Sequence, residues 1–129
     1  MKMTVGIDLV SVKRIEESLD QFGDRFLDRI FTKDEVAYAR AGFGDAGKHA
    51  MLQRLAARFA AKEAAIKALD LSEQGVSWRD LEVVKTASGA CEMRMHGRAK
   101  DHLKGGTSTT LSMSHEGDLA TAVLVAYEA

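Results

Sequence analysis

Hydrophobic and polar residues alternate in several short segments of the chain, most clearly near its start. Residues 3–10 alternate and are rich in β-branched side chains, which predicts a strand with Val5, Ile7 and Leu9 on one face. Four further strands are predicted, at residues 81–86, 91–95, 109–114 and 119–127. Because only residues 115–118 separate the last two, we expect them to form a hairpin.

The longest helical pattern covers residues 48–69. Its large apolar residues recur at steps of three and four, and alanines fill the positions between them. These large residues are Leu52, Leu55, Phe59, Ile66 and Leu69. The pattern predicts one long helix with an apolar stripe that faces the core.

Shorter helices are expected on the N-terminal side of the long one. Ser11 can cap a helix that runs from residue 12 towards residue 19, and residues 24–30 have apolar side chains at helical spacing. Thr32 and Glu35 have the spacing of a capping box, which predicts another helix start. A loop is expected at Gly42, Gly44 and Gly47, and a short helix at residues 97–104.

The order of these elements predicts the fold class. Helices come first and strands later, which favours an α+β fold. We expect a mostly antiparallel sheet packed against a long central helix and short N-terminal helices. With 129 residues and no internal repeat or linker, the chain is predicted to be a single domain over residues 1–129.

Composition excludes several classes of protein. The net charge of −1 argues against a bulk nucleic-acid binder, and no apolar run approaches the ~18 residues of a membrane span. The first residues lack the features of a signal peptide. One cysteine, Cys91, excludes an intrachain disulfide framework and a multi-cysteine zinc site. We therefore expect a cytoplasmic protein with no nucleic-acid or membrane partner.

Positive charge is nevertheless concentrated on the predicted long helix. Between residues 48 and 67 there are five basic residues and one acidic residue, Glu63. The basic residues are Lys48, Arg54, Arg58, Lys62 and Lys67. This local surplus predicts an anionic ligand at that surface.

Two carboxylates interrupt apolar patterns. Glu63 lies on the apolar stripe of the long helix, and Asp8 interrupts the first strand. Each has a simple structural explanation: Glu63 could pair with Lys67 at the helix edge, and Asp8 could lie on an edge strand or cap the next helix. Together they suggest a Mg²⁺ site, with substrate phosphates completing the coordination and neighbouring bases contacting phosphate oxygens.

His115 is the one histidine with a candidate role. It follows residues 112–114 (Ser-Met-Ser) at the predicted turn. A solvated turn histidine is the simpler interpretation, and a phosphate contact or a proton carrier is the alternative.

Three motifs in order along the chain resemble the holo-acyl-carrier-protein synthase family of phosphopantetheinyl transferases. They are Gly-Ile-Asp-Leu-Val at residues 6–10, Arg-Phe-Ala-Ala-Lys-Glu-Ala at residues 58–64 with Lys67, and Ser-Met-Ser-His at residues 112–115. The segment Arg-Ile-Phe-Thr at residues 29–32, followed by Glu35, is also similar. The second motif is the most specific, and the resemblance spans nearly the whole chain.

The resemblance implies a phosphopantetheinyl transferase fold and activity. In that reaction, phosphopantetheine passes from coenzyme A to a serine of an apo acyl carrier protein, and adenosine 3′,5′-bisphosphate is released. Asp8 and Glu63 would hold Mg²⁺ against the diphosphate, with Lys67 as a further catalytic residue. The residues implied to contact the nucleotide are Arg58, Lys62, Lys67, Ser114 and His115. Either Glu63 or a water molecule on the ion could accept the serine proton.

The resemblance also implies two kinds of protein partner. Arg14, Arg25 and Arg29 would contact the acidic helix of the carrier protein, which belongs to fatty-acid synthesis or to a polyketide pathway. Homotrimers with active sites between subunits are expected. The alternative is a non-catalytic module that binds a phosphate or nucleotide, or that only docks on a carrier protein. Such a module would need neither Asp8 nor Glu63.

Overall fold

The computed structural model of the chain describes residues 2–41 and 47–128. The N-terminal half contains β1 (Met3–Ser11), α1 (Val12–Phe22), α2 (Asp24–Ile30), α3 (Lys33–Arg40) and α4 (Gly47–Leu69). The C-terminal half contains the short 3-10 helix η2 (Trp78–Asp80), β2 (Leu81–Lys85), β3 (Cys91–Met95), α5 (Gly97–His102), β4 (Thr107–Glu116) and β5 (Leu119–Glu128). The predicted loop residues Gly42 and Gly44 lie outside the described residues, and Gly47 is the first residue of α4.

The strands form two antiparallel sheets. One has the order β1-β5-β4, with β4 and β5 joined as the predicted hairpin, and the other pairs β2 with β3. The α+β class is therefore confirmed, with the strands divided between two sheets. In the part of the chain that the structure describes, no helix has the length and apolar character needed to cross a membrane.

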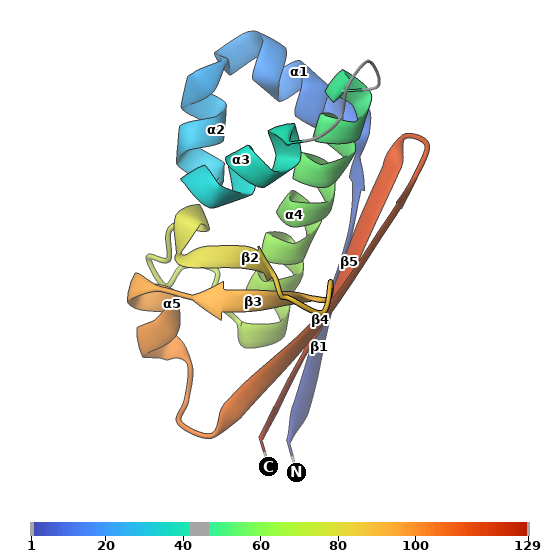
Figure 1. Cartoon of the computed structure of the whole chain (residues 1–129). Coiled ribbons are helices and arrows are strands. Elements are labelled where there is room, and N and C mark those ends of the chain that lie inside the picture. Colours follow the sequence, from blue (N-terminus) through green and yellow to red (C-terminus); the bar gives the residue numbers. More distant parts are fainter. Residues whose placement is uncertain (1, 42–46, 129) are drawn as a thin grey trace.

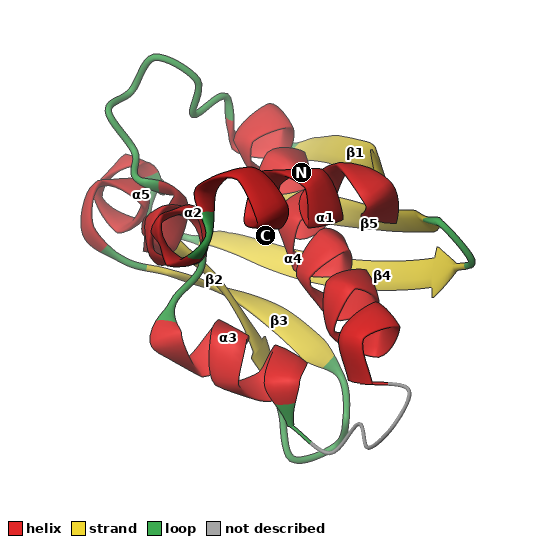
Figure 2. Cartoon of the chain, turned by 90° about the horizontal axis from the view of Figure 1, so that it is seen from above, coloured by secondary structure: helices red, strands yellow, loops and turns green. Residues whose placement is uncertain are grey.

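Helix α4 occupies the centre of the molecule (Figure 1). It packs against β1 and β5 on one side and against α3 and β2 on the other. Its alanines are buried around most of its circumference, so the helix has no single apolar stripe of the kind expected from the large residues. Seen from above, the helices lie on one side of the three-stranded sheet (Figure 2).

Close packing of β1 on α4 depends on Gly6. A Cβ atom added to Gly6 would overlap the carbonyl oxygen of Ala64 on α4. Since side chains alternate along a strand, Asp8 and Val10 share the helix-facing side of β1 with Gly6. The glycine thus brings Asp8 close to the last turns of α4.

The opposite face of the sheet is apolar and exposed. Met3, Val5, Ile7 and Leu9 lie on this outer face of β1, and each is 60–63% exposed. In the antiparallel register, Val5 and Ile7 pair with Val125 and Val123 of β5, which continue the apolar surface. We call the outer side chains of β1 and β5 the outer sheet face.

The N-terminus of α1 is capped differently from the expectation. The helix begins at Val12 as predicted, but the Ser11 side chain makes no capping hydrogen bond. Instead, the Lys13 amide donates to Asp118 Oδ1 at 2.9 Å, and Ser11 Oγ donates to Asp118 Oδ2 at 2.9 Å. The prediction that Ser11 caps this helix is therefore wrong, because an aspartate more than 100 residues away supplies the acceptor.

Candidate active site

Asp8 and Lys67 converge beside β1. Lys67 Nζ lies 3.2 Å from Asp8 Oδ1 and also donates to the carbonyl oxygen of Ile7 at 2.9 Å. Glu63 lies one helical turn before Lys67 on α4 and is half-buried. The structure thus brings together the three residues that the sequence suggested for metal binding and catalysis.

The charge of Asp8 acts on Glu63. Burial raises the pKa of Glu63, and the negative charge of Asp8 raises it further. The positive charges of Lys67 and Arg14 oppose this shift without cancelling it. A cation placed between two carboxylates that repel each other would be stabilised by both.

Asp8 and Glu63 fit a magnesium ion better than zinc or calcium. Among the described residues, no group of three or more histidine, cysteine, aspartate or glutamate side chains is arranged to hold a metal. Mg²⁺ binds through one or two carboxylates and takes its remaining oxygen ligands from water and substrate phosphates. The donor set of Asp8 and Glu63 therefore fits this ion when a phosphate-bearing substrate is present.

Lys62 lies elsewhere and has a structural role. Its side chain is fully buried, with Nζ 2.7 Å from Glu35 Oε1 and hydrogen bonds to the carbonyl oxygens of Trp78 and Leu81. An ammonium group has three donors, and all three are used here. This corrects the expectation that Lys62 contacts the nucleotide.

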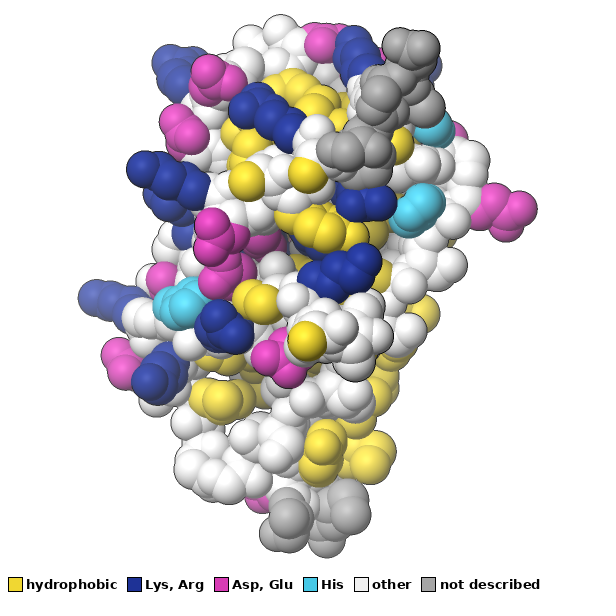
Figure 3. Space-filling model, viewed as in Figure 1, with side chains coloured by type: hydrophobic (Ala, Val, Ile, Leu, Met, Phe, Trp, Pro, Cys, Tyr) yellow, Lys and Arg dark blue, Asp and Glu magenta, His cyan; other side chains and the backbone are white. Residues whose placement is uncertain are grey.

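Arg58 faces a different side of α4 from Glu63. Five residues of helix correspond to a rotation of about 140° around its axis. Arg58 is 4% exposed, and its guanidinium carbon lies 4.3 Å above the centre of the Tyr38 ring. On the face drawn in Figure 3, basic side chains flank a hydrophobic patch where α3 meets α4. Because Arg58 and Glu63 point to different sides of α4, Arg58 is not adjacent to Asp8 within one chain.

Ser114 and His115 are also separated from Asp8 on a single chain. Both lie on β4, and β5 lies between β4 and β1. The strand extends to Glu116, so His115 is part of a strand and not of the turn. His115 pairs with Ala120 and both Ser114 and His115 are exposed. By alternation, Ser114 points to the same side of the sheet as Leu9 of β1, and His115 points to the other side.

The three arginines proposed for carrier binding lie on the first two helices. Arg14 belongs to α1, and Arg25 and Arg29 belong to α2. All three are exposed. Arg14 is close enough to Glu63 to lower its pKa, which places the start of α1 beside the carboxylates.

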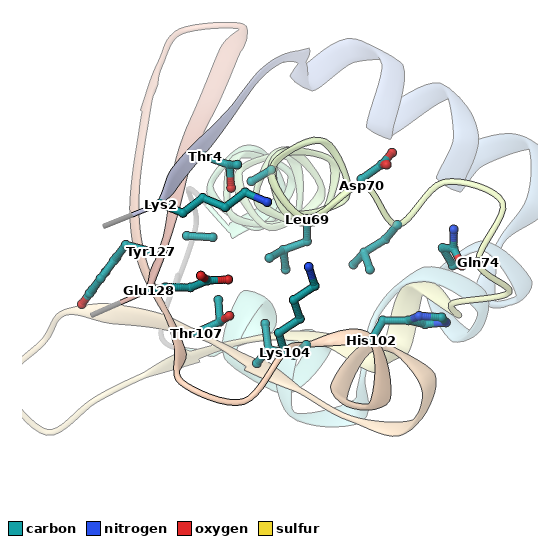
Figure 4. Close-up of a pocket in the computed structure, with 14 residues that line it drawn as sticks. Lys2, Thr4, Leu69, Asp70, Gln74, His102, Lys104, Thr107, Tyr127 and Glu128 are labelled. Atoms are coloured by element: carbon teal, nitrogen blue, oxygen red, sulfur yellow. The ribbon is translucent and has the colours of Figure 1, made fainter.

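A cavity of about 360 Å³ lies at the C-terminal end of α4, and it contains none of the predicted site residues. Figure 4 shows Lys2 and Lys104 pointing into it, with Glu128 on the same side as Thr107. Its basic and acidic side chains balance, so the cavity has no clear charge preference. Of the three converging residues, which we call the Asp8 cluster (Asp8, Glu63 and Lys67), Asp8 and Glu63 are partly buried and Lys67 is exposed.

Sequence reasoning missed Tyr38 and Lys85. Lys85 Nζ donates to the Tyr38 hydroxyl at 3.2 Å, and Arg58 lies over the same Tyr38 ring. The basic surplus at residues 48–67 was the only available signal, because the contacts with Tyr38 join α3, α4 and β2. A pattern within one helix does not reveal such contacts.

Comparison with known proteins identifies the family. The chain matches the 4′-phosphopantetheinyl transferase superfamily over residues 4–124. The chain belongs to this superfamily. It is 41% identical over 128 residues to the holo-[acyl-carrier-protein] synthase of Koribacter versatilis, covering 97% of this chain and 98% of the relative. It is 46% identical over 122 residues to the synthase of Carboxydothermus hydrogenoformans, covering 93% and 94%.

Solved structures agree with this assignment. A complex of ACPS with CoA from Chronobacterium ammoniagenes superposes with a TM-score of 0.85 at 29% identity, covering 100% of this chain and 99% of that one. The holo-[acyl-carrier-protein] synthase of Neisseria meningitidis gives a TM-score of 0.83 at 35% identity, covering 97% and 98%. The phosphopantetheinyl transferase fold implied by the sequence resemblance is therefore confirmed.

Proposed function

We propose that this chain transfers phosphopantetheine from coenzyme A to a serine of an apo acyl carrier protein and releases adenosine 3′,5′-bisphosphate. Relatives that carry the name holo-[acyl-carrier-protein] synthase and a similar structure that holds CoA support the proposal. The single observation that carries it is the convergence of Asp8, Glu63 and Lys67 beside β1.

Mg²⁺ is part of the proposal. Asp8 and Glu63 would hold the ion, which when bound supplies positive charge to the diphosphate of the substrate. Lys67 places an ammonium group beside Asp8, where it can stabilise negative charge that develops as the P–O–P bond of the diphosphate breaks. Attack of a hydroxyl on a phosphate needs chiefly alignment and charge neutralisation, which these residues provide.

The proposed protein partner is an acidic carrier. Arg14, Arg25 and Arg29 are exposed on α1 and α2, and Arg14 lies near the Asp8 cluster. An acidic helix placed against these arginines would bring its serine towards Asp8 and Glu63. Association steered by such charges is faster at low salt than at high salt.

We also propose a homotrimer with active sites between subunits, in the cytoplasm. The outer sheet face exposes four large apolar side chains of β1, which a second copy of the chain would cover. The nucleotide-contacting candidates Arg58 and His115 are separated from Asp8 on one chain, so a neighbouring copy is needed to complete the site. Cys91 is a free thiol, which suits a reducing compartment.

The deciding experiment is a mass measurement. Apo acyl carrier protein is incubated with coenzyme A, Mg²⁺ and the protein, and the expected result is a mass gain of one phosphopantetheine on the carrier. An unchanged carrier would contradict the proposed reaction. Binding of coenzyme A without transfer would instead support the alternative of a non-catalytic nucleotide-binding module.

A separate experiment tests the assembly. Val5→Lys places a charge on the outer sheet face, where the side chain is exposed in the single chain. Light scattering should give the mass of a trimer for the unmodified protein and a smaller species for the variant. A monomeric unmodified protein that is fully active would contradict the proposed sharing of sites.

A further inference from the structure

Three basic side chains surround the ring of Tyr38. The guanidinium carbons of Arg58 and Arg54 lie 4.3 Å and 4.6 Å from the ring centre, and Lys85 Nζ lies 5.4 Å from it. Lys85 Nζ also donates to the Tyr38 hydroxyl at 3.2 Å. The ring thus holds basic groups from α4 and β2 in one place through cation–π contacts and a hydrogen bond. We call Tyr38, Arg58 and Lys85 the Tyr38 cluster.

No carboxylate among the described residues pairs with the positive charge of Arg58. In the described part of the chain, neither Arg58 nor Lys85 forms an ion pair, although Glu35 and Cys91 act on Arg58 electrostatically from further away. Glu35 is already bound to Lys62. The Arg58 Nε atom is buried without a hydrogen-bond partner, and its NH1 group makes one long bond of 3.4 Å to the Arg54 carbonyl oxygen.

A buried donor without an acceptor costs free energy, so its retention calls for an explanation. An anion at the Tyr38 cluster would supply acceptors to Arg58 and would balance the surplus of positive charge. The tyrosine is itself affected by these charges. Burial raises the pKa of Tyr38, but the hydrogen bond from Lys85 and the positive charges of Arg54, Lys85 and Arg58 outweigh that effect and lower it.

We propose that Tyr38 is a positioning residue, which holds Arg58 and Lys85 for recognition of a phosphate monoester on the substrate. The inference rests on the proposed function, because coenzyme A carries a monoester on its ribose in addition to its diphosphate. The carboxylates suited to the metal and diphosphate lie on another side of α4, which leaves the monoester for the Tyr38 cluster. A phosphate monoester is close to doubly charged at neutral pH, matching two cations.

The test compares two nucleotides by calorimetry, without carrier protein. Adenosine 3′,5′-bisphosphate contains the ribose monoester, and adenosine 5′-monophosphate lacks it. The unmodified protein should prefer the bisphosphate. Tyr38→Leu removes the ring and should reduce this preference roughly tenfold, in keeping with the strength of desolvated cation–π contacts. Tyr38→Phe keeps the ring and should retain most of the preference.

Lys85→Met tests the Tyr38 cluster at a second position. The Lys85 side chain is exposed, so its replacement leaves the packing of the core unchanged. It should also reduce the preference, whereas Lys100→Met on α5 should leave it unchanged. In the transfer assay, both cluster variants should raise KM for coenzyme A while kcat stays near that of the unmodified protein. Kinetics with dephospho-coenzyme A, which lacks the monoester, should change little. Thermal unfolding verifies that each variant is folded.

The outcomes separate this inference from the proposed function. Equal loss of affinity for both nucleotides in Lys85→Met would overturn the monoester assignment, because the cluster would then contact the other phosphate. An unchanged preference in Tyr38→Leu would overturn the positioning role. A protein that binds the bisphosphate selectively but never modifies a carrier would contradict the proposed reaction and leave the recognition site supported.

Discussion

The ammonium group of Lys67 lies 3.2 Å from the carboxylate of Asp8, on a surface where the lysine side chain is 53% exposed. An ion pair this exposed contributes about 0–1 kcal/mol to stability. The arrangement therefore has small structural value, although Gly6 and the last turns of α4 hold it in place. We expect its importance to lie in the reaction.

The first prediction concerns Asp8→Asn. The variant keeps the shape of the side chain but removes the charge that would hold Mg²⁺. Transfer of phosphopantetheine should fall by about a hundredfold or more, since removal of one group that stabilises a charged transition state has effects of this size. Mass spectrometry of the carrier measures the rate. The free energy of unfolding should change by at most about 1 kcal/mol.

Asp101→Asn on α5 is the matched control, because Asp101 is exposed and α5 lies across the molecule from β1 (Figure 1). It should transfer at the normal rate. If Asp8→Asn transfers as fast as this control, Asp8 does not bind an essential ion.

The second prediction concerns the buried pair of Lys62 and Glu35. Lys62→Met removes one partner and leaves the Glu35 carboxylate without its cation in the core. Loss of one partner of a buried ion pair costs about 3–5 kcal/mol. Urea unfolding should show a loss of stability of this size. A variant that is as stable as the unmodified protein and has a higher KM for coenzyme A would contradict this structural role. It would show instead that Lys62 contacts the nucleotide.

The sequence predicted the elements well where the signal was local. The helix at residues 24–30 has its predicted bounds, and the capping box is present: the Glu35 amide donates to Thr32 Oγ1 and the Thr32 amide donates to Glu35 Oε1. Asp8 and Glu63 are predictable as candidates because each is a charged residue that interrupts an apolar pattern. Their proximity to each other was a hypothesis that only the packing of β1 on α4 could establish.

The missed features are contacts between residues far apart in the sequence. Glu35 was recognised as a capping residue, yet the same carboxylate also accepts the Val83 amide at 3.0 Å and binds Lys62. The large residues of the long helix by themselves predict an apolar stripe on one side. The buried alanines show that α4 is packed on several sides, and Lys62 lies on one of these buried sides. A one-sided stripe would not predict this position.

The third prediction links pH and stability through Glu63. Burial and Asp8 raise the pKa of Glu63 above its ordinary value of 4.5, so ionisation of this group costs stability in the folded protein. The cost is present above the folded pKa and disappears as the pH falls below 4.5, where the carboxyl is protonated in both states. Without divalent ions at pH 7, Glu63→Gln should therefore unfold at a higher temperature than the unmodified protein.

The difference in unfolding temperature should shrink as the pH is lowered towards 4.5. Addition of Mg²⁺ at pH 7 should stabilise the unmodified protein more than the variant. A variant that is less stable than the unmodified protein at pH 7, with a deficit that grows as the pH rises from 4.5, would contradict the raised pKa of Glu63.

The fourth prediction concerns the carrier. Arg25→Glu reverses an exposed charge on α2 and should raise KM for an acidic carrier protein about tenfold at low salt, with the affinity for coenzyme A unchanged. The effect should decrease at high ionic strength, since screening weakens steering. Lys100→Glu on α5 makes the same change in net charge and is the control. Equal effects of both variants would mean that net charge, and not an interface on α2, determines association.

The contact at Gly6 has a consequence for how this enzyme can vary. No side chain fits between β1 and α4 at that point, so main-chain atoms in direct contact determine the spacing of the strand and the helix. The gap between Asp8 and Glu63 is then fixed by backbone geometry, whatever residues fill the surrounding interior. Exchanges elsewhere in the interior could alter heat resistance while the reacting groups keep their separation.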